Sequence, residues 1–238
     1  MDLQLLIGEV DQDLRGRGTA DRAEHEKVYL KSDLEHFGVS VPIVRAVAKG
    51  IAADYSAMSR DQLIELVDAL WSVPVHERRM LVVELLGLYG DRLQVSDAEG
   101  IERLLRGSHT WALVDPLAAS VMGRLVERHD ELGAVLDRWA ADEDFWIRRS
   151  ALLALLVPLR RGGGDFERFS RYADAMLDER EFFIRKAIGW VLRDTGKKRP
   201  DLVYDWILPR APRASGVTIR EAVKPMSPGQ RATVLAAR

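Results

Sequence analysis

Residues 181–194, EFFIRKAIGWVLRD, carry the pattern that decides the fold, because an earlier segment repeats it. Residues 144–153 are DFWIRRSALL, and aligning Ile147 with Ile184 matches an aromatic-aromatic-Ile-basic-basic string at a spacing of 37 residues. Self-similarity at about 35 to 45 residues is typical of helical repeat arrays. Four further segments share the phase, so that six equivalent positions lie near residues 44, 79, 114, 149, 186 and 221.

The hydrophobic pattern predicts the fold class. Apolar residues recur at helical intervals in every well-formed segment, and no convincing strand pattern is present. We therefore expect an all-α protein, a right-handed or curved superhelical solenoid of stacked helix pairs. It should form one domain over residues 1–238, with a capping helix over 1–18, repeats over about 20–224 and a weakly patterned tail over 225–238. The second helix is expected from Ala20 to about Phe37, with Gly38 as its stop.

Composition excludes several classes of site. The chain has no Cys and five scattered His, so neither disulfides nor a metal site are expected. No basic and apolar leader pattern and no long apolar run is present, which predicts a soluble, cytoplasmic protein. A net charge of −2 gives no global attraction to nucleic acid, so a polyanion site would need local segregation of charge.

Basic residues recur in one phase of the repeat and would fall on the face that lines the concave side of an array. The members of this stripe are Arg45, Arg78 or Arg79, Arg148 or Arg149, Arg185 or Lys186, and Arg220. Such a stripe suits a duplex phosphate backbone. It equally suits ion pairs with carboxylates of the neighbouring repeat, and the pattern alone leaves both interpretations open.

Two Trp residues and one Asp lie in the same phase. Trp111 and Asp115 are four residues apart, so both side chains lie on one helix face, and Trp190 lies two repeats further on. Taken singly, a Trp in a helical repeat is usually a core residue, and Asp115, which precedes Pro116, would usually be a helix cap. Together on one surface they indicate an aromatic cleft around a carboxylate.

Three segments carry a resemblance to a known family: HTWALVD at 109–115, FWIRR at 145–149 and KAIGWVLR at 186–193. They resemble the AlkD-type DNA alkylation repair glycosylases, and the similarity runs from about Tyr29 to Val223. The resemblance implies a HEAT-like fold whose concave basic surface holds duplex DNA. It also implies base excision repair of cationic N3- and N7-alkylpurines, such as 3-methyladenine and 7-methylguanine, without base flipping and without a cofactor.

The resemblance also implies roles for single residues. Trp111, Asp115 and Trp190 match the catalytic cleft of the family, and Tyr29, Arg45 and Arg149 match residues that contact DNA. The stripe adds four residues to the predicted DNA-binding set: Arg148, Arg185, Lys186 and Arg220. The sequence departs from the family at Thr110, where a second Trp can stand.

The chemistry of such substrates explains why one carboxylate is enough. Glycoside hydrolysis ordinarily uses two, one of them a general acid for the leaving group. A cationic alkylpurine leaves as a neutral base, so Asp115 alone could stabilise an oxocarbenium-like sugar and position water.

The alternatives to a glycosylase are a non-catalytic HEAT-like module that binds DNA structure or a protein partner, and a structural adaptor. A monomer is expected, because an array that clasps a duplex needs no partner subunit.

Overall fold

The protein is described by a computed structural model that covers residues 2–238; Met1, in the predicted capping segment, lies outside the described residues. Among the described residues no strand is formed, and the one β-bridge joins Glu35 to Val75. The prediction of an all-α protein is confirmed. The chain divides into two compact units, an N-terminal unit that ends at Leu117 and a C-terminal unit, Ala118–Arg238.

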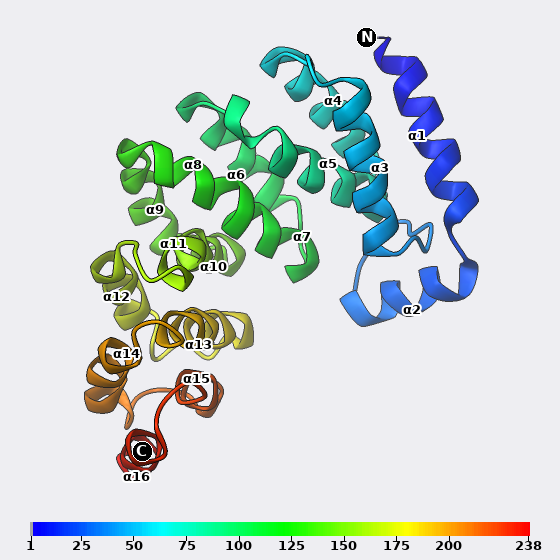
Figure 1. The fold of residues 1–238 in the computed structure, drawn as a ribbon. Coiled ribbons are helices and arrows are strands. Elements are labelled where there is room, and N and C mark those ends of the chain that lie inside the picture. Colours follow the sequence, from blue (N-terminus) through cyan, green and yellow to red (C-terminus); the bar gives the residue numbers. More distant parts are fainter. Residues whose placement is uncertain (1) are drawn as a thin grey trace. The chain divides into compact units, whose positions relative to one another are not determined.

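The N-terminal unit begins with α1, where a capping helix is expected, and α3 packs against α5, as α5 does against α4 and α7 (Figure 1). Its helices are α1 (Leu3–Arg17), α2 (Ala20–Leu30), α3 (Val41–Asp54), α4 (Arg60–Trp71), α5 (His76–Leu88), α6 (Ala98–Arg106) and α7 (Trp111–Pro116). Short 3₁₀ turns at Gly90–Arg92 and Val95–Asp97 join α5 to α6.

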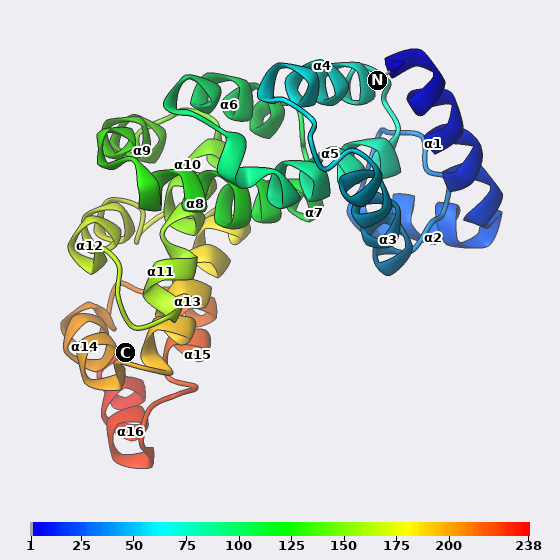
Figure 2. The same cartoon turned by 45° about the horizontal axis from the view of Figure 1, so that its top comes forward.

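The C-terminal unit stacks α10, α13 and α15 side by side, as Figures 1 and 2 show from two directions. Its α-helices are α8 (Gly123–Arg128), α9 (Gly133–Ala140), α10 (Phe145–Ala154), α11 (Leu156–Arg160), α12 (Phe166–Ala175), α13 (Phe182–Gly196), α14 (Pro200–Ile207), α15 (Gly216–Ala222) and α16 (Pro228–Ala236). A π-helical stretch, Leu117–Met122, precedes α8, and 3₁₀ turns lie at Asp130–Leu132 and Leu208–Arg210.

The repeat inferred from the sequence coincides with one series of helices. The six equivalent positions fall in α3, α5, α7, α10, α13 and α15. In the shared motif, Ile147 and Ile184 are fully buried, and the ring of Phe183 packs on Trp146 at 4.7 Å and on Phe145 at 6.3 Å between ring centroids. The repeated aromatic and Ile positions therefore form the core between α10 and α13.

The other helix series of the C-terminal unit is joined by hydrogen bonds between residues one repeat apart. The Tyr172 hydroxyl on α12 donates to Asp137 on α9 at 2.5 Å, and Trp206 Nε1 on α14 donates to the Ser170 hydroxyl at 2.7 Å. Separations of 35 and 36 residues match the sequence period. Each repeat is thus fixed to its neighbour by polar as well as apolar contacts.

Two segments differ from the sequence expectation. The helix α2 ends at Leu30 rather than near Phe37, because Lys31 adopts a left-handed φ of 50°. The tail forms α16, whose first turn is held by a capping box between Ser227 and Gln230. That Ser-x-x-Gln spacing is a helix-start signal that the apolar pattern of the tail did not display.

Candidate functional site

The helix that carries Trp111 and Asp115 begins directly after a sharp turn. His109 has a left-handed φ of 49°, and Thr110 is extended with a φ of −147°. The Thr110 hydroxyl accepts a hydrogen bond from the Ala112 amide at 3.4 Å and so caps α7. Trp111 is therefore the first helical residue, and Asp115 follows one turn later.

Both predicted catalytic side chains of α7 reach solvent. Leu113 and Val114 are fully buried, whereas Trp111 and Asp115 are each half-buried. Asp115 lies inside α7, whose N-terminal cap is Thr110, so the interpretation of Asp115 as a cap before Pro116 is wrong. The sequence thus places an indole and a carboxylate one turn apart on the solvent-facing side of a helix whose other side is core.

The helix changes geometry immediately after Asp115. Pro116 has no N–H to donate to the carbonyl one turn earlier, and Leu117–Met122 are π-helical. Wider π-turns inside helices occur frequently at functional sites. The local backbone therefore supports a special role for the residues just before it.

Tyr29 lies against Trp111. Their rings meet edge to face, with centroids 6.0 Å apart and planes at 89°. Tyr29 is 71% exposed and its neighbour Val28 is 68% exposed. The structure thus brings together three of the predicted site residues, Tyr29, Trp111 and Asp115, within the N-terminal unit.

The helix α2, which carries Tyr29, has no buried residue of its own. Its position therefore depends on the loop that follows it. The Glu77 carboxylate at the start of α5 accepts hydrogen bonds from the amides of Phe37, Gly38 and Val39, at 3.0, 2.7 and 3.0 Å. Gly38 has a left-handed φ of 77° and accepts from the Thr19 amide at 3.3 Å. A fully buried carboxylate therefore fixes the loop on which α2 depends.

Trp190, the third predicted catalytic residue, lies on α13 in the C-terminal unit. Its indole Nε1 donates to Asp194 Oδ2 at 3.1 Å, one turn further along the same helix. Asp194 is 2% exposed and also accepts from Arg160 at 2.8 Å and Lys197 at 2.7 Å. Burial opposes ionisation of Asp194, but the hydrogen bonds from Lys197 and Arg160 outweigh it and hold the pKa below its ordinary value.

Three residues of the predicted DNA-binding set form ion pairs across repeats. The pairs are Arg45 with Glu84 at 2.8 Å, Arg148 with Glu179 at 2.8 Å and Lys186 with Glu221 at 2.9 Å. The interpretation of the stripe as inter-repeat pairing is therefore confirmed for these three residues. Arg45 and Lys186 remain more than a third exposed, so a pair of this kind leaves part of each cation open to a second anion.

The remaining members of the set differ widely in exposure. Arg149 is 2% exposed, and its guanidinium donates to the Phe183 carbonyl. Arg185 is half-buried and donates to the Glu179 carbonyl at 2.7 Å, whereas Arg220 is exposed. In the stripe's N-terminal part, Arg78 is buried against Asp11, so that position is structural.

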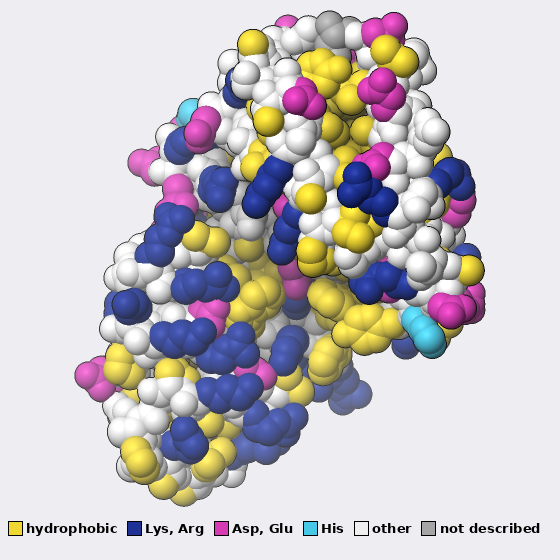
Figure 3. Space-filling view, turned by 45° about the vertical axis from the view of Figure 1, so that its right-hand side comes forward, with side chains coloured by type: hydrophobic (Ala, Val, Ile, Leu, Met, Phe, Trp, Pro, Cys, Tyr) yellow, Lys and Arg dark blue, Asp and Glu magenta, His cyan; other side chains and the backbone are white. Residues whose placement is uncertain are grey.

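Charge is segregated between the two units. The N-terminal unit has 13 Lys and Arg against 20 Asp and Glu, a net charge of −7, whereas the C-terminal unit has 22 against 17, a net charge of +5. Figure 3 shows Lys and Arg side chains gathered over the C-terminal unit. The local segregation that a polyanion site requires is therefore present, although the whole chain is slightly acidic.

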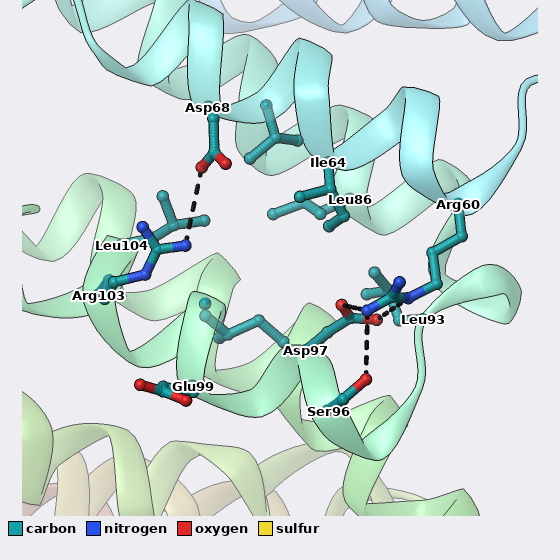
Figure 4. A pocket seen from close by; sticks show the side chains of 13 residues that line it. Arg60, Ile64, Asp68, Leu86, Leu93, Ser96, Asp97, Glu99, Arg103 and Leu104 are labelled. Atoms are coloured by element: carbon teal, nitrogen blue, oxygen red, sulfur yellow. Dashed lines mark hydrogen bonds and ion pairs between the residues drawn. The ribbon is translucent and has the colours of Figure 1, made fainter.

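A separate cavity of about 370 Å³ lies between α4 and α6 (Figure 4). Arg60 forms a bidentate ion pair with Asp97 on its wall, at 2.5 and 3.0 Å, and Arg103 lies 3.8 Å from Asp68. None of the predicted site residues lines it. We assign it no part in the chemistry of Trp111 and Asp115.

Two features of the structure were not found by sequence reasoning. Asp194 follows Trp190 by four residues, so helical spacing could have paired them. His36 lies about one repeat before the adjacent residues His76 and Glu77, but nothing in this spacing resembles a known motif. Contacts of this kind depend on the loop after α2, which the apolar pattern did not predict.

Solved structures share this fold. A predicted DNA alkylation repair enzyme from Enterococcus faecalis is 21% identical, with a TM-score of 0.76 over 89% of this chain and 98% of that chain. AlkD2 from Streptococcus mutans is 18% identical, with a TM-score of 0.56 over 78% of this chain and 89% of that chain. No curated protein is similar enough to count as a match.

Among residues 2–238, every helix is too short or too polar to cross a lipid bilayer.

The family follows from a match over most of the chain. A family model described as "DNA alkylation repair enzyme" matches residues 10–226. The chain therefore belongs to the DNA alkylation repair enzyme family.

Proposed function

We propose that this enzyme is a DNA glycosylase that hydrolyses the N-glycosidic bond of N3- and N7-alkylated purines in duplex DNA. The observation that carries the proposal is the pair Trp111 and Asp115, one turn apart on the solvent-facing side of α7, with Tyr29 packed against the indole. A half-buried carboxylate beside aromatic faces suits a reaction in which positive charge develops on a sugar.

Asp115 would act on the sugar rather than on the base. An alkylated purine carries a positive charge and leaves as a neutral base, so no general acid is needed. Negative charge on Asp115 stabilises the oxocarbenium-like sugar as the bond breaks, and the same carboxylate positions or deprotonates the attacking water. The Trp111 face adds about 0.5–2 kcal/mol of attraction to the developing cation, depending on desolvation.

Trp190 is included in the catalytic set on the resemblance to the family. Its indole N–H is occupied by Asp194, so its π face is the part that can act on a cationic sugar. Asp194 and its basic partners would keep that ring in one orientation.

The DNA contacts in this proposal come from Tyr29 and from the basic set: Arg45, Arg148, Arg149, Arg185, Lys186 and Arg220. Phosphate contacts position a duplex without reading its sequence. The net charge of +5 on the C-terminal unit supports this assignment for Arg148, Arg149, Arg185, Lys186 and Arg220, because each neutralised phosphate adds affinity. Arg149 is buried, so it would support Phe183 and the backbone of α13 as well as any phosphate.

The deciding experiment measures release of free base from duplex DNA that contains 7-methylguanine, under single-turnover conditions. We expect Asp115→Asn to lower the rate about 10²–10³-fold, as when one preorganised stabilising group is removed, while duplex affinity is retained. Asp54→Asn is the matched control, because Asp54 ends α3 in the same unit and is exposed. A duplex with a neutral damaged base should be a poor substrate.

The opposite outcome has a defined meaning. If the unmodified protein binds the duplex yet releases no base above the spontaneous rate, the glycosylase proposal is wrong. A non-catalytic module that binds DNA structure or a protein partner would then explain the basic unit and the exposed aromatic residues.

A further inference from the structure

Three metal-ligating side chains from three different segments converge beside α2. Glu26 lies on α2, His36 on the loop that follows, and Glu77 in the first turn of α5. One ligand atom from each lies within 4.8 Å of the other two. A point therefore exists within 4.8/√3, about 2.8 Å, of all three atoms. Zn²⁺ binds His nitrogen and carboxylate oxygen at about 2.0–2.2 Å, so a sub-ångström adjustment closes the site.

The imidazole of His36 lacks hydrogen-bond partners among the described residues. Both of its ring nitrogens are inaccessible to solvent, and within residues 2–238 neither has a hydrogen-bond partner. Buried polar atoms in native proteins are nearly always satisfied, so such an atom calls for an explanation such as an ion.

The second histidine holds the first in place. The rings of His36 and His76 are stacked, with centroids 4.5 Å apart and planes at 12°. His76 is itself buried, so the stack fixes the plane of His36 from one side. A metal ligand needs this kind of support to keep its ring orientation.

The two carboxylates keep capacity for a cation. Glu77 Oε1 accepts from Gly38 and Val39, but Oε2 accepts from Phe37 alone. Glu26 is half-buried and also pairs with Arg22 one turn earlier on α2. The site thus joins two carboxylates and one imidazole, a ligand set that suits a divalent cation better than the single exposed guanidinium of Arg22 does.

We propose that Glu26, His36 and Glu77 bind one divalent transition-metal ion, Zn²⁺ by ligand type, with water completing the coordination. The ion would tie α2 to the start of α5. This matters because α2 buries none of its own residues and carries Tyr29. This proposal departs from the sequence expectation of no metal site, which rested on the absence of Cys and on the five scattered His. It also does not depend on catalysis.

The test uses the full chain, first stripped with a chelator and then titrated with Zn²⁺ against a chromophoric competitor. We expect one ion per chain and a higher thermal unfolding temperature in the metal-bound form. Glu26→Gln should weaken binding at least about 100-fold, because losing even an outer partner of a ligand costs 10–100-fold. Co²⁺ should give the visible absorption of a site with a nitrogen ligand, lost in His36→Ala.

The controls separate this site from scattered surface binding. His25→Ala removes an exposed histidine from the same helix and should leave affinity unchanged. Glu26→Gln keeps the His36–His76 stack, so it reports on the ion even if His36→Ala fails to fold. Less than about one tenth of an ion per chain at saturating Zn²⁺, or equal affinity in Glu26→Gln and the unmodified protein, would overturn the proposal.

Discussion

The two units of this protein are built from the same helical repeat but differ in charge and in the kind of carboxylate they hold. The N-terminal unit has a net charge of −7 and carries Asp115, half-buried at a solvent-facing position of α7. The C-terminal unit has a net charge of +5 and carries Asp194, buried among Arg160, Lys197 and Trp190. One repeat pattern thus supports two opposite electrostatic environments.

Under the proposed function, the two units would meet two opposite electrostatic demands. Stabilising a cationic sugar requires negative charge, whereas holding a polyanion requires positive charge. A net charge of −2 for the whole chain hides both. Charge therefore has to be counted for each structural unit before it is used as an argument about nucleic acid.

The largest expected contrast lies between the two carboxylates. Asp115→Asn should lower base release about 10²–10³-fold, with a smaller effect on stability than Asp194→Asn, because Asp115 is half-buried whereas Asp194 is 2% exposed. Asp194→Asn should do the reverse, destabilising the C-terminal unit by about 1–3 kcal/mol, since a buried carboxylate loses its charge-assisted hydrogen bonds. We expect the lower end of this range of destabilisation, because Arg160 and Lys197 are half exposed and water can solvate them when Asp194 is replaced.

Single-turnover base release and hydrogen exchange of α13 measure the two effects separately. Exchange in α13 should accelerate in Asp194→Asn and stay unchanged in Asp115→Asn. A loss of more than about 100-fold in base release for Asp194→Asn, in a protein with normal exchange, would place Asp194 in the chemistry and end the contrast.

Much of the fold was predictable from the sequence, and the reasons are physical. The string shared by residues 144–153 and 181–194 repeats because Ile147, Ile184 and their aromatic neighbours form the same inter-repeat contact. Helix periodicity likewise predicted that Trp111 and Asp115 share a face. These features depend on local spacing, which a sequence records directly.

The remaining features depend on contacts between distant residues. The loop after α2 follows the buried carboxylate of Glu77, about 40 residues away, so no local pattern ends α2 at Leu30. The ion pair of Lys186 with Glu221 likewise depends on how two repeats meet. A basic residue in the stripe could therefore not be assigned to phosphate or to a neighbouring carboxylate by its position alone.

Acid should affect the two units at different pH, which gives a second, intermediate contrast. His76 is buried beside His36 and Arg79, and its pKa is lowered from 6.5 to about 3, chiefly by burial. The unfolded chain then binds a proton that the folded unit does not, so stability falls as pH drops below about 6.5. At 1.36 kcal/mol per pKa unit the loss at pH 5 is about 2 kcal/mol.

In the C-terminal unit, the carboxylate of Glu221 affects stability only at a lower pH than His76 does. Glu221 is buried, yet hydrogen bonds from Lys186 and Lys224 lower its pKa from 4.5 to about 2. Its contribution to stability is complete above about pH 4.5 and is lost as pH falls towards 2. Hydrogen exchange at pH 7 and at pH 5, with a chelator present, should therefore show weaker protection of α5 before α15. Equal loss in both helices, or a pH dependence unchanged in His76→Gln, would contradict this order.

The smallest expected effect concerns a single phosphate contact. Arg220 is exposed on α15, in the same helix series as the rest of the basic stripe, and the C-terminal unit supplies the positive charge. If Arg220 neutralises one phosphate, Arg220→Ala should reduce the slope of log affinity against log salt by about 0.9 and weaken binding uniformly across sequences. Arg103→Ala is the matched control, because Arg103 is 66% exposed but lies on α6, in the other helix series of the acidic unit. An equal change in both variants would mean that net charge alone attracts the duplex, whereas a change in Arg220→Ala alone would assign the contact to the repeat phase that carries Arg220.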